Sequence, residues 1–404
     1  MGSKQFAKKQ HRKLGKVDAL LNEKLEKVEW GEFKLGDLFS IHNTLSFNTD
    51  KLITGNEYDY VTRTSQNQGI LKQTGFVNSE NINPAGNWSL GLLQMDFFYR
   101  EKSWYAGQFV RKIIPKIHIP ENAIRFFTTV LNNQKQKLLS VLVRDVDKLF
   151  LSTKILLPSK KAKIDFEFIE NFIAALENER ISKLANYLEV TGLKDYTLTD
   201  EEKEVLESFR NSKTSGGIID NQTVKHFEWR EFRLGDLFEI NSSKKRFDAN
   251  KVEISEVGQP YVVRTSLNNG IRGFINEEEQ FINYGNTISF GQDTATMFYQ
   301  EHPYFTGDKI KIVKSKDQNF NKKNAQFFIT TMTKSFSSFS WGGSSFNVNV
   351  ISSQMLNLPV QNNQPNYALM EIFISAIQKL VIKDVVLYAN KKIAGTKSVV
   401  TKKE

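Results

Sequence analysis

The chain contains no cysteine and five histidines among its 404 residues. Disulfides, thiolate metal sites and cysteine nucleophiles are therefore excluded. The histidines have no metal-ligand spacing, which predicts structural or exposed roles for His11, His42, His118, His226 and His302. No stretch approaches the roughly 18 consecutive apolar residues that a membrane helix requires, and the N-terminus is polar and basic, unlike a secretory signal. We therefore expect a cytoplasmic protein that binds no metal or other cofactor.

Several catalytic motifs are also missing. A DNA methyltransferase requires a glycine-rich cofactor loop and an Asn/Asp-Pro-Pro-aromatic site for a flipped base, and the sequence has neither. It also has no P-loop for ATP. A nuclease requires clustered carboxylates for Mg²⁺. The nearest approach is Glu201-Glu202-Lys203, which is better explained as the start of a helix. The sequence thus predicts a chain that does no chemistry of its own.

The composition is that of a folded protein with an anionic partner. Apolar residues make up 40% of the chain and charged residues 25%, which indicates globular rather than disordered structure. The length allows two or three domains. The formal net charge of +10 favours a polyanion such as nucleic acid, although charge alone is weak support.

An internal duplication is the strongest signal in the sequence. The segment 29–39 recurs at 228–238 with nine of eleven positions identical, and Arg-Thr-Ser-x-Asn-x-Gly-Ile at 63–70 recurs at 264–271. Shorter echoes follow in the same order: Gly86-Asn87 with Gly285-Asn286, Phe98-Tyr99 with Phe298-Tyr299, Gly107 with Gly307, Phe126-Phe127 with Phe327-Phe328, and Leu157-Pro158 with Leu358-Pro359. Whole domains are therefore repeated.

Long helices are expected after each repeat. Apolar residues from Phe166 to Leu188 recur mostly at steps of three, four and five, as an amphipathic helix requires. A second helix is expected from about Pro365, a suitable first-turn residue, through Lys392. Its nearly apolar stretch from Leu380 to Leu387 suggests more than one packing partner. Two interpretations stay open: the helices pair with each other, or each packs on its own module alone.

The pattern divides the chain into five parts. We expect a basic N-terminal segment (1–27), a first module (28–160), a central helix with a short helix and linker (161–226), a second module (227–361) and a C-terminal helix (362–404). The short helix should begin at the capping box Thr199–Glu202 and end near Phe209. Within the modules, 32–39 and 309–314 have strand character, whereas 122–139 and 324–336 are expected to be helical. The fold class is therefore mixed α/β, with two tandem α+β modules.

Polar side chains suited to DNA gather beside a glycine in each repeat. Arginine can bind guanine, asparagine and glutamine can bind adenine, and hydroxyls can hold phosphate. The DNA-binding candidates are Arg63, Thr64, Ser65, Gln66, Asn67, Gln94, Arg264, Thr265, Ser266, Asn268, Asn269 and Ser344. An alternative applies to residues that both copies share, because they are least suited to reading different sequences and instead support a loop or grip phosphate. Positions that differ, such as Gln66 against Leu267 and Gln94 against Thr294, are the better candidates for sequence choice.

The order of module, helix, module and helix resembles the specificity subunit of type I restriction-modification systems and of the related type IIB enzymes. The resemblance covers nearly the whole chain and rests on the paired Leu-Gly-Asp-Leu-Phe starts, the segments 60–65 and 261–266, the strand ends at 156–158 and 357–359, and the helices that follow. The chain departs from the common pattern because it lacks Pro-Pro-x-x-Glu-Gln before each helix and carries the insertion 194–217. Type I and type IIB both remain open.

The resemblance implies a function and partners. Each target recognition domain would read one half of an interrupted sequence in double-stranded DNA, and the helices would form an antiparallel coiled coil. Adenine DNA methyltransferase subunits, two of them, would dock on the helices, with a restriction or translocase subunit as a further partner. The docking candidates are Phe172, Leu176, Phe373, Ile377, Leu380 and Leu387. The rival interpretation is a duplicated adaptor that binds protein without DNA specificity.

Helix length predicts the spacing of the two half-sites. A helix of about 27 residues is about 40 Å long, which matches about one turn of DNA at about 3.4 Å per base pair. We expect half-site centres about 10 to 12 base pairs apart.

Overall fold

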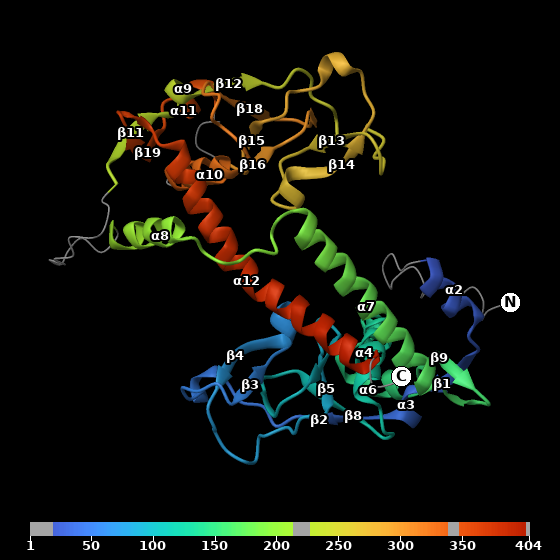
Figure 1. The fold of residues 1–404 in the computed structure, drawn as a ribbon. Coiled ribbons are helices and arrows are strands. Elements are labelled where there is room, and N and C mark those ends of the chain that lie inside the picture. The colour runs from blue at the N-terminus through green and yellow to red at the C-terminus, as the bar shows by residue number, and fades with distance from the viewer. Residues whose placement is uncertain (1–18, 213–226, 338–346, 401–404) are drawn as a thin grey trace. The chain divides into compact units, whose positions relative to one another are not determined.

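The chain divides into two compact units, each built around one of the repeats. The computed structural model describes residues 19–212, 227–337 and 347–400. The first unit comprises Met1–Leu184 with Lys392–Glu404, and the second comprises Ala185–Lys391. Both boundaries fall inside long helices, α7 (Phe166–Val190) and α12 (Tyr367–Val400), so each unit combines a module with stretches of both helices (Figure 1).

The first module contains three small sheets. They have the strand orders β1-β9-β10, β2-β8-β5-β6 and β4-β3-β7, and all pairs are antiparallel except β3 with β7. The strands are β1 (Trp30–Lys34), β2 (Phe39–Asn43), β3 (Tyr58–Val61), β4 (Ile70–Thr74), β5 (Asn87–Gly91), β6 (Asp96–Arg100), β7 (Trp104–Ala106), β8 (Val110–Pro115), β9 (Lys154–Lys160) and β10 (Lys163–Ile164). The helices of the first unit before α7 are α2 (Ala19–Lys27), α3 (Leu35–Leu38), α4 (Ile124–Asn132), α5 (Lys135–Leu138) and α6 (Val146–Ser152).

The second module repeats this topology strand for strand. Its sheets have the orders β11-β19-β20, β12-β18-β15-β16 and β14-β13-β17, and here too one pair, β13 with β17, is parallel. The strands are β11 (Trp229–Arg233), β12 (Phe238–Ser242), β13 (Gln259–Val262), β14 (Ile271–Ile275), β15 (Thr287–Gly291), β16 (Met297–Gln300), β17 (Phe305–Thr306), β18 (Ile310–Ser315), β19 (Met355–Gln361) and β20 (Gln364–Pro365). Its helices are α9 (Leu234–Leu237), α10 (Lys322–Phe336) and α11 (Val348–Ser352). The mixed α/β class with two tandem modules is therefore confirmed.

The shared Leu-Gly-Asp-Leu-Phe segment builds the core of each module. Leu35 and Phe39 are 0% exposed, and Phe39 packs edge-on against Trp88 with ring centroids 5.7 Å apart. A Cβ on Gly36 would lie 2.6 Å from the carbonyl oxygen of Leu151, so only glycine allows this approach. The expected strand 32–39 is wrong in part, because Leu35–Leu38 forms the single turn α3 between β1 and β2.

The long helices are where the apolar periodicity places them, but their starts differ. Helix α7 begins at Phe166 after Asp165, whose carboxylate accepts from the backbone N–H of Phe168 at 2.9 Å. The first-turn role of Pro365 is wrong, since this residue lies in β20 opposite Val360. Asn366 caps α12 instead and accepts from the N–H of Leu369 at 3.0 Å.

Two other predicted elements need correction. The helix expected over 122–139 is broken at Asn133 and Gln134 into α4 and α5, which a 3₁₀ turn at Glu121–Ala123 precedes. The echo that paired Gly86-Asn87 with Gly285-Asn286 is shifted by one position. The strand register shows this shift: Asn87 lies opposite Arg100 and Thr287 lies opposite Gln300, so Gly86 corresponds to Asn286.

The described part of the inserted segment, residues 194–212, folds onto α12 within the second unit. The capping box predicted at Thr199 is confirmed, and helix α8 runs from Asp200 to Ser212. Burial alone would raise the pKa of Glu202, but hydrogen bonds from Lys379, the backbone N–H of Thr199 and Ser375 outweigh it and lower the pKa to about 2. Phe209 stacks on Phe373 with ring centroids 4.1 Å apart. Helix α8 is therefore an integral part of this unit.

No helix in the described part of the chain is long and apolar enough to cross a bilayer. Nor do the described residues bring together three or more acidic or histidine side chains that could hold a metal ion.

Candidate nucleic-acid interface

A tight loop follows the equivalent strands β3 and β13 and carries most of the candidate residues. We call residues 62–69 and 263–270 the recognition loops. Each ends with three consecutive residues at positive φ: 44°, 53° and 79° for Asn67, Gln68 and Gly69 in the first module. The second loop repeats this with 48°, 52° and 80° at 268–270. Asparagine and glycine tolerate this region best, which explains why the two copies share them.

The shared asparagine and threonine side chains hold the loop through hydrogen bonds to its backbone. The Asn67 amide donates to the carbonyl of Ile70 at 3.1 Å, and Asn268 donates to Ile271 at 3.0 Å. The Thr64 hydroxyl accepts from the N–H of Gln66 at 3.2 Å, as Thr265 does from Leu267. These bonds agree with the alternative that the shared residues support the loop.

A buried side chain on β6 or β16 anchors each recognition loop by donating a hydrogen bond to a loop carbonyl. In the first module Arg100, 2% exposed, donates to the carbonyl of Gln68 and to the Ser89 hydroxyl. Burial lowers the pKa of Arg100 to about 10, against the opposing effect of Asp59, so the guanidinium stays charged at neutral pH. In the second module Gln300 takes this place and donates to the carbonyl of Asn269 and to Ser289, both at 3.1 Å. Neither anchor stood out in the sequence, because no motif marks it.

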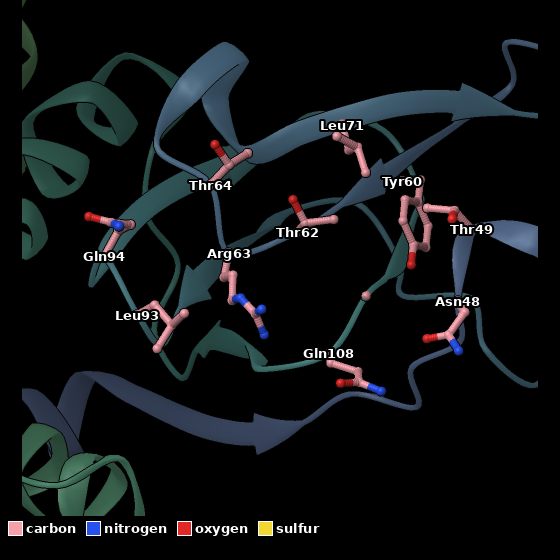
Figure 2. A pocket seen from close by; sticks show the side chains of 11 residues that line it. Asn48, Thr49, Tyr60, Thr62, Arg63, Thr64, Leu71, Leu93, Gln94 and Gln108 are labelled. Atoms are coloured by element: carbon pink, nitrogen blue, oxygen red, sulfur yellow. The ribbon is translucent and has the colours of Figure 1, made fainter.

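The first recognition loop forms one wall of a pocket of about 520 Å³. Figure 2 shows the Arg63 side chain extending into this space, with the amides of Gln94, Gln108 and Asn48 around it. The lining residues are Asn48, Thr49, Tyr60, Thr62, Arg63, Thr64, Leu71, Leu93, Gln94, Gly107 and Gln108. The guanidinium of Arg63 lies 5.2 Å from the ring centroid of Phe109. Three predicted residues, Arg63, Thr64 and Gln94, therefore share one pocket with residues from distant segments.

The second module has a corresponding pocket of about 600 Å³. Its lining consists of Arg246, Phe247, Asp248, Ala249, Tyr261, Val263, Arg264, Gly307 and Asp308. Tyr261 donates to the carbonyl of Phe247 as Tyr60 does to that of Phe47, so the walls match. Here Arg264 forms an ion pair with Asp293, which Lys309 also contacts at 2.9 Å.

The remaining candidates have different surroundings. Ser65 donates to Asp96, whose other oxygen accepts from Lys135 at 2.6 Å. Gln66, Ser266 and Asn269 are exposed on the loops. Ser344 lies outside the described residues.

One of the six docking candidates is buried in a module core, and a second packs against the other core. Phe172 is 2% exposed within the first core, and Phe373 packs between Phe209 and Phe327. The docking role of Phe172 is wrong for this structure, because helical periodicity does not distinguish a face that packs on its own module from a free one, whereas that of the half-buried Phe373 stays a prediction. Leu176 and Ile377 are half-buried, whereas Leu380 and Leu387 are 47% and 43% exposed.

Comparison with known proteins assigns the chain to a family. The family described as type I restriction modification DNA specificity domain matches twice, at residues 27–186 and 227–387. A curated relative is the specificity subunit S.BcgI of a type II restriction enzyme from Heyndrickxia coagulans, 23% identical over 288 residues, covering 70% of this chain and 75% of the relative. Among solved structures, the type I restriction-modification S subunit from M. genitalium aligns with a TM-score of 0.53 at 14% identity, covering 92% of this chain and 94% of that one.

These matches agree with the resemblance found in the sequence, and with the expectation of a specificity subunit rather than a catalytic one. The repeated domain, the two matching pockets and the family match together show that this chain belongs to the type I restriction-modification DNA specificity family.

Proposed function

We propose that this chain selects the DNA site of a restriction-modification complex, and that each module reads one half of a bipartite sequence in duplex DNA. One observation carries the proposal: the same loop and pocket occur twice on the same scaffold, with different side chains exposed in each. To read two different half-sites, two modules need the same backbone scaffold but different side chains at the base edges, and the two pockets have both features. The net charge of +10 suits the phosphate backbone.

The long helices are proposed to set the distance between the half-sites. Helix α7 has 25 residues, so at about 1.5 Å per residue it is about 37 Å long. This length corresponds to about 11 base pairs. Within the first unit, Lys392 of α12 lies 4.0 Å from Glu177 of α7, which supports pairing of the two helices.

Methyltransferase subunits are proposed to dock on α12. Four apolar side chains on this helix are between 38% and 73% exposed: Leu380, Val381, Val385 and Leu387. Apolar surface of this kind marks a site for a protein partner. On the basis of the family resemblance, the proposed partners are two adenine methyltransferase subunits, with a restriction or translocase subunit as a further component.

Docking can be tested by co-purification. With Leu380→Asp and Leu387→Asp combined, we expect the amount of adenine methyltransferase that co-purifies to fall at least about tenfold, because two buried charges would face an apolar surface. Leu139→Asp is the matched control, since Leu139 is 48% exposed and directly follows α5 of the first module. Equal recovery with both variants would contradict docking on α12.

The salt dependence of DNA binding tests the function itself. If the chain contacts six or more phosphates, its affinity for a duplex should fall by about 10³ or more between 50 and 200 mM salt. Fluorescence anisotropy with a labelled duplex measures this directly. An adaptor that binds protein alone would bind no duplex at any of these salt concentrations, and that result would overturn the proposal.

A further inference from the structure

The two pockets share corresponding lining residues, among them Arg63 with Arg264 and Gln108 with Asp308. The backbone N–H of Leu92 donates to the carbonyl of Phe109 at 2.9 Å, and that of Gln292 donates to Lys309 at the same distance. The N–H of Gly107 donates to Val61 at 2.8 Å, as that of Gly307 does to Val262. These bonds fix which residues occupy the same place. Leu71, Leu93, Gln108 and Phe109 correspond to Arg272, Asp293, Asp308 and Lys309.

The first pocket presents apolar and amide groups around one arginine. Leu71, Leu93 and Phe109 are each 50% exposed, and the Arg63 guanidinium lies over the Phe109 ring. Exposed apolar side chains at a recognition site gain free energy only when a ligand covers them with apolar atoms. In the major groove of DNA the apolar group at a base edge is the thymine methyl, and the amides of asparagine and glutamine suit adenine.

The corresponding side chains in and beside the second pocket are charged, and of these Asp308 lines it. Arg264 pairs with Asp293, and Arg246 lies 3.1 Å from Asp308. A carboxylate on one edge of a guanidinium fixes its orientation and leaves other N–H groups free to donate. An arginine held in this way suits the O6 and N7 acceptors of guanine.

We propose that the first pocket selects an A·T pair by contact with the thymine methyl, and that the second selects a G·C pair through its carboxylate-held arginines. This inference rests on the proposed function, because it presupposes that the modules read base edges. The base-pair preference would then depend on residues that differ between the two modules, chiefly Leu93 and Phe109 in the first and Asp293 and Lys309 in the second. The shared loop residues supply the same frame to both.

The experiment begins with selection of binding sites from a random duplex library by the full-length chain. Single thymines in the enriched site are then replaced by deoxyuridine, which removes the methyl group and leaves the base pair intact. Guanines are replaced by 7-deazaguanine, which removes the N7 acceptor. We expect deoxyuridine at one position of one half-site to weaken binding about five- to tenfold, and 7-deazaguanine to do so in the other half-site.

An exchange variant assigns these effects to the pockets. In Leu93→Asp with Phe109→Lys, the deoxyuridine effect should disappear and preference for the A·T pair should fall about tenfold, while the 7-deazaguanine effect remains. The two replaced side chains, Leu93 and Phe109, are each 50% exposed, and Leu139→Asp is again the control.

The possible failures are distinguishable. Enrichment of a site in which deoxyuridine has no effect, or in which the exchange variant keeps the same preference, would overturn this inference and leave the proposed function standing. Failure of the wild-type chain to enrich any sequence would overturn both.

Discussion

An alanine at position 91 should weaken specific DNA binding by about 30-fold or more, with little change at the half-site read by the other module. The estimate assumes that one module supplies half of a specificity worth about 10³ or more over non-specific DNA. Gly91 ends β5, where an added Cβ would lie 2.9 Å from the Cα of Arg63. Because backbone rather than a flexible side chain occupies this space, the first recognition loop must move.

The second module supplies the matched control for this change. A Cβ on the corresponding Gly291 would meet the hydroxyls of Thr296 and Thr294 at 2.6 and 2.7 Å, and these side-chain ends can rotate away. Gly291→Ala should therefore reduce affinity much less than Gly91→Ala. Both variants are compared by titration against the selected duplex, with thermal unfolding as the check that the modules remain folded. Equal losses in the two variants would show that the approach of β5 to the loop does not position Arg63.

Replacement of Arg100 by methionine should destabilise the first module by about 3 kcal/mol, whereas glutamine should cost less than half of that. Methionine keeps most of the volume but leaves the carbonyl of Gln68 and the Ser89 hydroxyl without their buried donor. Glutamine performs this task in the second module, where Gln300 donates to Asn269 and Ser289. The hydrogen bond to Gln68 that Arg100→Met removes is one that anchors the first recognition loop.

Tryptophan fluorescence can follow this unfolding, since Trp88 and Trp104 are both buried in the first module. We expect the unfolding transition of the first module to shift to a lower denaturant concentration in Arg100→Met, and to shift less in Arg100→Gln. If the two variants were equally unstable, the charge of Arg100 near Asp59, rather than its hydrogen bonds, would be the stabilising feature.

Much of the scaffold could be predicted because its signals are local. The repeated Leu-Gly-Asp-Leu-Phe segment and the apolar periodicity of α7 depend on neighbouring residues, and both indicated the right elements. The helix starts were less predictable, since Pro365 and Asn366 are both plausible at a first turn. Pairing of Pro365 in β20 with Val360 in β19 decides between them, through a tight hairpin that turns at Asn362 and Asn363, both at positive φ.

The recognition loop could be predicted from the sequence, but the pocket that it lines could not. Arg63 and Gln94 were found because the duplication marks the loop and the divergent positions. Phe109 and Gln108 come from the segment after β7, which reaches the loop through the parallel pairing of β3 with β7. The sequence does contain a signal for this segment: Gly107 and Gly307 are shared, whereas the residues directly after them differ between the two modules.

The central claim is that two modules read two half-sites at a distance set by the helices, and selection from a random duplex library tests it most directly. We expect two blocks of fixed bases whose centres lie about 10 to 12 base pairs apart. Deletion of about seven residues, two turns, from both α7 and α12 should shorten the unread gap by about three base pairs and leave both blocks unchanged. A single continuous block, or a gap that stays the same after the deletion, would contradict the account.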